Sequence, residues 1–184
     1  VNAEKLTLDD CLSRILEAKP RILCFTVYGQ NVNAGTTNMS GALHLSKFLK
    51  EKKIDIPIIY VGSHVQSLPY ESLENEKSID IILTNEGVYS LRNLLNLKNF
   101  SLENLKNVRG IGYRDQEEIL LNEPEKIVPQ ERMDIDLPGY AWDLLPFNKK
   151  PFDLYRSPMW HAEYDESKRT PYAALQTSLG CKFG

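Results

Sequence analysis

The residues best suited to chemistry are small or polar ones that end or directly follow three short apolar runs. They are Thr26, Tyr28, Gly29, Gly62, Ser63, His64, Glu86 and Gly87. Glycine lets a ligand approach the backbone closely, and serine and threonine hydroxyls can hydrogen-bond its oxygen atoms. This combination favours a binding site for a polar, nucleotide-like ligand. The alternative is structural, with Thr26 as a half-buried strand residue and Gly62 as a turn glycine.

Two of these residues allow more than one role. His64 could contact a bound metal, because neutral imidazole is a common metal ligand, but a single histidine after a strand is more often solvated or hydrogen-bonded. Glu86 could accept hydrogen bonds from a ligand, or it could favour the N-terminus of a following helix through the helix dipole. Both pairs of alternatives stay open at this point.

The three cysteines, Cys11, Cys24 and Cys181, are odd in number and far apart. This spacing argues against a secreted disulfide framework. Cys11 and Cys24 lie in apolar surroundings and are predicted to be core residues. Cys181, near the end of the sequence, would by itself be an isolated free cysteine.

The composition is that of an ordinary globular chain. Its 184 residues, with 42% hydrophobic and 26% charged side chains, suit one domain with an appendage. A net charge of −3, with lysines scattered among glutamates, gives no electrostatic footprint for nucleic acid. No apolar run approaches the roughly 18 residues of a membrane span, and the first residues lack the layout of a signal peptide. We therefore predict a cytoplasmic protein without a nucleic-acid or membrane partner.

Hydrophobic periodicity predicts helices and strands in alternation. The predicted elements are a helix from Leu8 to Leu16, a strand at Ile22–Tyr28, a helix over 38–53, a strand at Ile58–Val61, a short helix over 70–77, a strand at Ile79–Leu83 and a helix from Val88 to Leu95. Such alternation predicts an α/β fold with a doubly wound, Rossmann-like (flavodoxin-like) parallel sheet. Because the alternation opens with a helix, the first strands of the sheet are expected to be missing upstream.

Two further features follow this alternation. Apolar segments at 108–114 and 117–121 predict a hairpin, and the residues after it, rich in proline and aromatics, predict an extended linker. In parallel sheets, ligands bind at the carboxyl ends of the strands. We therefore expect the loops at 29–38, 62–67 and 84–87 to share one edge of the sheet.

Six landmarks in a fixed order make the prediction more specific. They are CFTVYG with Thr26, YVGSHV with Gly62 and Ser63, SIDIILTNEGV with Glu86 and Gly87, VRGIGYRDQEEI, LPGYAWDLLP, and TSLGCKFG with Cys181. In this order, the sequence resembles the cobalamin-binding domain that precedes the barrel of cobalamin-dependent radical S-adenosylmethionine (SAM) enzymes. The resemblance covers essentially the whole chain.

The resemblance implies cofactors and a partner. Residues 1–122 would form a cobalamin-binding α/β domain with the hairpin, and residues 123–184 a linker into a missing radical SAM barrel of the same chain. Cobalamin would lie against the eight residues named at the outset. Cys181 would be the first thiolate of a CxxxCxxC motif, which in the parent enzyme holds a four-iron, four-sulfur (4Fe-4S) cluster to which SAM binds.

Three positions depart from the family pattern. Ser63 replaces the second glycine after its strand, Asn85 the first glycine of the following turn, and Val88 the second glutamate. The DxHxxG motif that supplies an axial histidine in methionine-synthase-like domains is absent. We expect this fragment to supply the cofactor platform of a methyltransferase or related radical enzyme and to be inactive alone. The alternative is a non-catalytic ligand-sensing or interaction module with a degenerate cobalamin slot.

Overall fold

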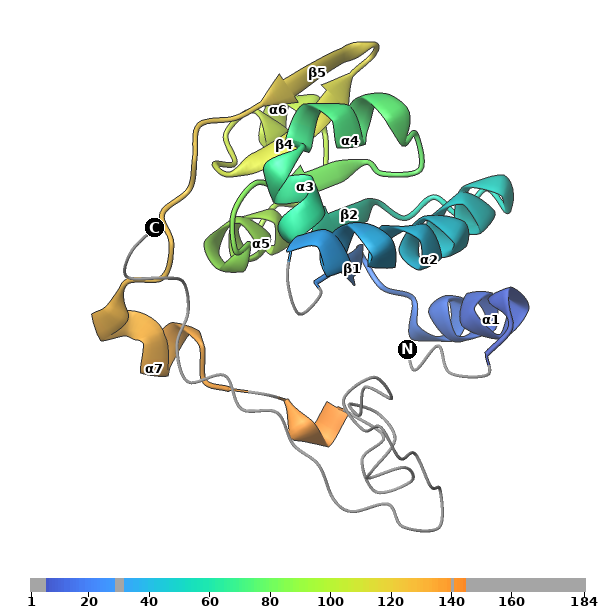
Figure 1. The fold of residues 1–184 in the computed structure, drawn as a ribbon, viewed down its shortest axis with the longest axis horizontal. Coiled ribbons are helices and arrows are strands. Elements are labelled where there is room, and N and C mark those ends of the chain that lie inside the picture. The colour runs from blue at the N-terminus through green and yellow to red at the C-terminus, as the bar shows by residue number, and fades with distance from the viewer. Residues whose placement is uncertain (1–5, 29–31, 140, 145–184) are drawn as a thin grey trace. The chain divides into compact units, whose positions relative to one another are not determined.

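The computed structural model describes residues 6–28, 32–139 and 141–144 (Figure 1). The chain divides into two compact units, with the boundary after Pro138. The first unit holds the sheet and its helices. Of the second unit, the described part contains one short 3-10 turn, η2 (Trp142–Leu144).

The first unit is built on one five-stranded sheet in the order β1-β2-β3-β4-β5. The strands are β1 (Leu23–Thr26), β2 (Ile58–Val61), β3 (Ile81–Leu83), β4 (Ile111–Asp115) and β5 (Glu118–Leu121). The first three run parallel, whereas β4 is antiparallel to β3 and to β5. The α/β prediction is confirmed, and the predicted hairpin extends the same sheet.

Helices cover both faces of this sheet (Figure 1). They are α1 (Leu8–Ala18), α2 (Val32–Glu51), α3 (Ser63–Ser67), α4 (Pro69–Asn75), α5 (Val88–Leu95) and α6 (Leu102–Leu105), followed by η1 (Gln130–Arg132) and α7 (Met133–Asp136). One core cluster joins Leu49, Tyr60 and Leu73, on α2, β2 and α4. The other joins Ile59 and Leu94, on β2 and α5. Successive residues of β2 point to opposite faces, so a strand covered on both sides reads as a continuous apolar run.

Helix α2 begins at Val32, which corrects the predicted loop at 29–38. Glycine and polar residues in that stretch favoured a loop, but Gly35 is buried inside the helix. A Cβ atom added at Gly35 would lie 2.1 Å from the Ser63 Oγ. The glycine therefore serves the close packing of α2 on α3. The predicted loop at 62–67 is likewise mostly helix, as α3.

Strand β1 is half-covered, which corrects one cysteine prediction. Cys11 is buried at 4% exposure, as predicted, but Cys24 is exposed. Leu23 and Phe25 pack against the first core cluster, whereas the buried residues of the second cluster include none of β1. The second face of β1, with Cys24 and Thr26, stays open among the described residues.

None of the helices among the described residues is both long and apolar enough to cross a membrane. Nor do the described residues bring together three or more histidine, cysteine, aspartate or glutamate side chains that could hold a metal ion.

Two adjacent leucines of α5 test the second core cluster. Leu94 is fully buried, whereas Leu95 is 45% exposed. We expect Leu94→Ala to lower the free energy of unfolding by about 3 kcal/mol, because the substitution leaves a cavity. Leu95→Ala, the control, should lower it by less than about 1 kcal/mol. Chemical denaturation measures both, and equal effects would contradict the placement of α5.

Candidate functional site

The segments that follow the three parallel strands meet at one edge, as predicted. Gln66, on α3 after β2, connects them. Its Nε2 donates hydrogen bonds to the Tyr28 hydroxyl after β1 (3.0 Å) and to the Asn85 carbonyl oxygen after β3 (2.5 Å). These contacts define the candidate site at the carboxyl ends of β1, β2 and β3. Gly29, also predicted here, lies outside the described residues.

Tyr28 and Thr26 present hydroxyl groups at this edge. Thr26 ends β1 on its open face, and the Tyr28 side chain is 45% exposed. The Tyr28 carbonyl oxygen accepts a hydrogen bond from Asn38 Nδ2 of α2 (2.9 Å). Partial burial raises the pKa of Tyr28, and the nearby Glu86 carboxylate adds to the increase. The hydroxyl therefore stays protonated near neutral pH and can donate to a ligand.

Ser63 carries the unpaired polar atom of the site. It is the first residue of α3, and its Oγ is buried without a hydrogen-bond partner in the described part of the chain. Gly35 packs directly against it. A buried hydroxyl without a partner costs about 1–3 kcal/mol of desolvation, so such atoms are uncommon in folded proteins. The Ser63 hydroxyl is thus a polar group whose hydrogen-bonding capacity the described residues leave unused.

Gly62 has a structural role that needs no ligand. Its φ angle is +149°, and an added Cβ atom would lie 1.9 Å from the Val27 carbonyl oxygen. The amide of Val27 also donates to the Val61 carbonyl oxygen (2.8 Å), which continues the pairing of β1 with β2. Only glycine fits at position 62, because the Val27 carbonyl lies where a side chain would begin.

His64 lies on α3 and faces α2. Its Nδ1 is 3.0 Å from the Thr36 Oγ1, so one ring nitrogen already has a hydrogen-bond partner. The described residues hold no cluster of ligands that would make His64 part of a protein-built metal centre. The hydrogen-bonding role is the one observed for this histidine.

Glu86 holds the chain that follows the hairpin, and Gly87 begins the next helix. The Glu86 Oε1 accepts a hydrogen bond from the Val128 amide (2.5 Å). Gly87 has a φ of +85° and is the N-cap of α5, and its amide donates to the Asn85 Oδ1 (2.9 Å). The sequence did not indicate this contact, because the Glu86 carboxylate binds a backbone amide 42 residues further along. Glu86 also directly precedes the N-cap of α5, as the helix-dipole role requires.

The segment 123–138, here called the strap, is fastened to α5 and to the loop after β3. Asn85 Nδ2 donates a hydrogen bond to the Glu125 carbonyl oxygen (3.0 Å). Asn93 Nδ2 donates one to the Glu125 Oε2 (3.0 Å). Near the end of the strap, Tyr89 donates to the Asp136 Oδ2 (2.6 Å). The ion pair with Arg132 and the Tyr89 hydrogen bond lower the pKa of Asp136.

The sequence predicted an extended linker over 123–184 and did not indicate that Asn85 fastens its first part. The available signal was that Asn85 stands where the family pattern has glycine. The asparagine side chain can both donate a hydrogen bond, here to Glu125, and accept one, here from Gly87. Cys181, the predicted cluster ligand, lies outside the described residues.

The fold is α/β and is similar to that of a solved cobalamin-dependent enzyme. The structure of the cobalamin-dependent S-adenosylmethionine radical enzyme OxsB with aqua-cobalamin bound superimposes with a TM-score of 0.51 and 20% identity, over 72% of this chain and 17% of that one. Its apo, selenomethionine-labelled form gives a TM-score of 0.43. No protein-family model matches the chain.

Among curated proteins, the chain is similar to the "uncharacterized methyltransferase PH0819" of Pyrococcus horikoshii. The two are 26% identical over 181 residues, which is 98% of this chain and 34% of that protein. The chain therefore spans about a third of the length of this relative.

Two glycines test the packing at this edge. We expect Gly62→Ala to lower the free energy of unfolding by about 3 kcal/mol, because its Cβ would collide with the Val27 carbonyl and its φ is unfavourable for alanine. Gly41→Ala, in α2 with no atom near the new methyl group, should raise it by about 0.5–1 kcal/mol. Urea denaturation of the two variants checks this, and a neutral Gly62→Ala would contradict the described approach.

Proposed function

We propose that this chain is the cobalamin-binding part of a radical SAM enzyme whose parent acts as a methyltransferase or catalyses a related radical reaction. The observation that carries the proposal is the buried, unpaired Ser63 Oγ at the carboxyl ends of parallel strands. The similarity of the fold to a cobalamin-dependent enzyme supports it. So does the similarity to a protein described as a methyltransferase.

The residues present fit the cofactor in part. Thr26, Tyr28 and Ser63 offer hydroxyl groups at one edge, where they would hydrogen-bond oxygen atoms of a cobalamin side chain or tail. His64 and Gly87 would flank the same place. Gly62 and Glu86 contribute through the fold, because the first is packed against Val27 and the second holds Val128. Bound cobalamin would supply a transferable methyl group.

The remaining parts of the proposal concern the parent enzyme. This chain covers 34% of one relative and 17% of the solved enzyme chain, which is compatible with a radical SAM domain elsewhere on those polypeptides. In this proposal that domain binds SAM, and Cys181 provides one thiolate of its 4Fe-4S cluster. We place the protein in the cytoplasm.

One observation favours the second candidate, a non-catalytic ligand-sensing or interaction module. Two residues expected to serve the cofactor, Gly62 and Glu86, are fully explained by contacts within the chain. The binding of hydroxocobalamin separates the two candidates.

Hydroxocobalamin is the probe for the proposed site. After mixing and desalting, the wild-type chain should retain the visible spectrum of the corrinoid. We expect Ser63→Ala to weaken binding about fivefold, because one hydrogen bond is lost, without lowering the stability of the free protein. Ser101→Ala is the matched control, since that exposed serine makes no side-chain cap. No retained spectrum, or equal binding by Ser63→Ala, would favour the non-catalytic module.

A second prediction concerns the cobalt ligand. Because DxHxxG is absent and His64 is already bonded to Thr36, we expect His64→Ala to change cobalamin affinity less than about twofold. The visible spectrum of the bound corrinoid should stay that of the wild type. Lost binding together with a shifted spectrum would instead identify His64 as the axial ligand.

A further inference from the structure

Gln66 uses both hydrogens of its side-chain amide at the carboxyl edge. One bonds to the Tyr28 hydroxyl (3.0 Å) and the other to the Asn85 carbonyl oxygen (2.5 Å). An amide nitrogen carries two hydrogens, so a single Nε2 can make both bonds at once. The Tyr28 oxygen is the acceptor in its bond with Gln66, and its own hydrogen can be donated to a ligand. Gln66 therefore orients the hydroxyl that the edge offers.

Asn85 connects this edge with the strap. Its backbone carbonyl oxygen accepts the bond from Gln66, whereas its side-chain Nδ2 donates to the Glu125 carbonyl oxygen of the strap (3.0 Å). One residue thus bonds in two directions, toward the site and away from it. A continuous series of hydrogen bonds runs from Glu125 through Asn85 and Gln66 to the Tyr28 hydroxyl.

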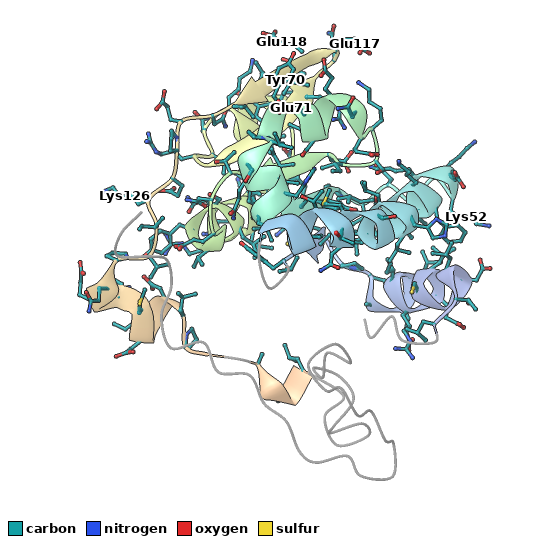
Figure 2. The ribbon with its side chains drawn as sticks, in the orientation of Figure 1. Lys52, Tyr70, Glu71, Glu117, Glu118 and Lys126 are labelled. Atoms are coloured by element: carbon teal, nitrogen blue, oxygen red, sulfur yellow. The ribbon has the colours of Figure 1, made fainter. Side chains whose placement is uncertain are left out.

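The strap lies exposed between its two attachments to the loop after β3. Glu125 makes the first attachment, and Val128, which is 3% exposed, makes the second by donating its amide to the Glu86 Oε1. Between them, Ile127 is 65% exposed and Lys126 is exposed as well (Figure 2). A segment held by few buried groups opens locally more often than the core does. The strap can therefore detach here while the sheet stays folded.

The beginning of the strap is held without using the site. The Gly110 amide donates to the Glu123 carbonyl oxygen (2.8 Å), and Arg109 Nε donates to the Pro124 carbonyl oxygen (3.0 Å). These donors directly precede β4 and lie outside the series of bonds that ends at Tyr28. Release of the strap after Pro124 therefore leaves the hairpin attached and affects the bonds to the loop after β3.

We propose that the strap regulates ligand binding at the carboxyl edge through Asn85 and Gln66. While the strap is fastened, the Asn85 carbonyl is held where Gln66 can bond both to it and to Tyr28. When the strap is released, Asn85 loses its bond to Glu125, and the Tyr28 hydroxyl loses its fixed orientation. By thermodynamic reciprocity, a ligand that bonds to Tyr28 also favours the fastened strap. The nature of that ligand, a corrinoid, rests on the function proposed above.

Hydrogen exchange of the Val128 amide tests this coupling without ligand, because that amide exchanges when its bond to Glu86 opens. Gln66→Met has a side chain of similar length that cannot donate, so we expect the Val128 amide to exchange about fivefold faster. Ser67→Ala, at an exposed position of the same helix, is the matched control and should change the rate less than about twofold.

The backbone amides of β2 serve as the reference in this experiment. Faster exchange confined to the strap supports the proposal. Unchanged Val128 exchange in Gln66→Met would overturn it. An equal increase in β2 would also overturn it, because Gln66 would then act through overall stability rather than through the strap.

Hydroxocobalamin tests the regulation itself. When it saturates the wild-type chain, Val128 exchange should slow about fivefold. Asn93→Ala removes the strap's bond at the Glu125 Oε2 without changing the edge, and it should weaken hydroxocobalamin binding about threefold. Asn107→Ala, which removes a bond to the Glu103 carbonyl oxygen instead, is the control and should leave binding unchanged.

The outcomes separate this proposal from the function on which it rests. Hydroxocobalamin that binds without slowing Val128 exchange would overturn the regulation and leave the proposed function intact. If the wild-type chain retains no hydroxocobalamin, the proposed function fails and the corrinoid is not the ligand. The comparison of Gln66→Met with Ser67→Ala then still decides whether the strap and the edge are coupled.

Discussion

The close approach of backbone to backbone at the carboxyl ends of the parallel strands determines the form of the candidate site. Gly62 lies against the Val27 carbonyl, and Gly35 lies against Ser63, so β1, β2, α2 and α3 come together with no room for a methyl group. This packing buries the Ser63 hydroxyl and brings Gln66 within reach of Tyr28 and Asn85. The glycines shape the site indirectly, by positioning the polar atoms beside them.

The two edges of the sheet use polar groups differently. At the carboxyl edge, Tyr28 and Thr26 offer hydroxyls on a partly open strand. At the amino edge, Lys50 and Asp80 form an ion pair. Charged groups at the amino edge thus pair with each other, whereas the carboxyl edge carries hydroxyl groups on an open strand face.

Most of the fold was predictable because hydrophobic periodicity indicates which residues are buried. In this protein the buried residues lie between the sheet and the helices on its two faces. The strands at 58–61 and 79–83 and the hairpin were found in this way. The start of α2 was not, because Gly35 looks like a loop residue until Ser63 is seen beside it. Cys24 was assigned to the core because an apolar run does not reveal that one face of its strand is uncovered. The bond between Glu86 and Val128 joins distant positions, and no local pattern predicts it.

The strap extends the fastened chain well beyond the sheet. Without its bonds to Asn85, Asn93 and Tyr89, the last fastened residues would be those near the end of β5. Ordering a segment costs about 1–2 kcal/mol of backbone entropy for each residue. The side-chain hydrogen bonds to α5 and to the loop after β3, together with the burial of Val128, offset that entropy.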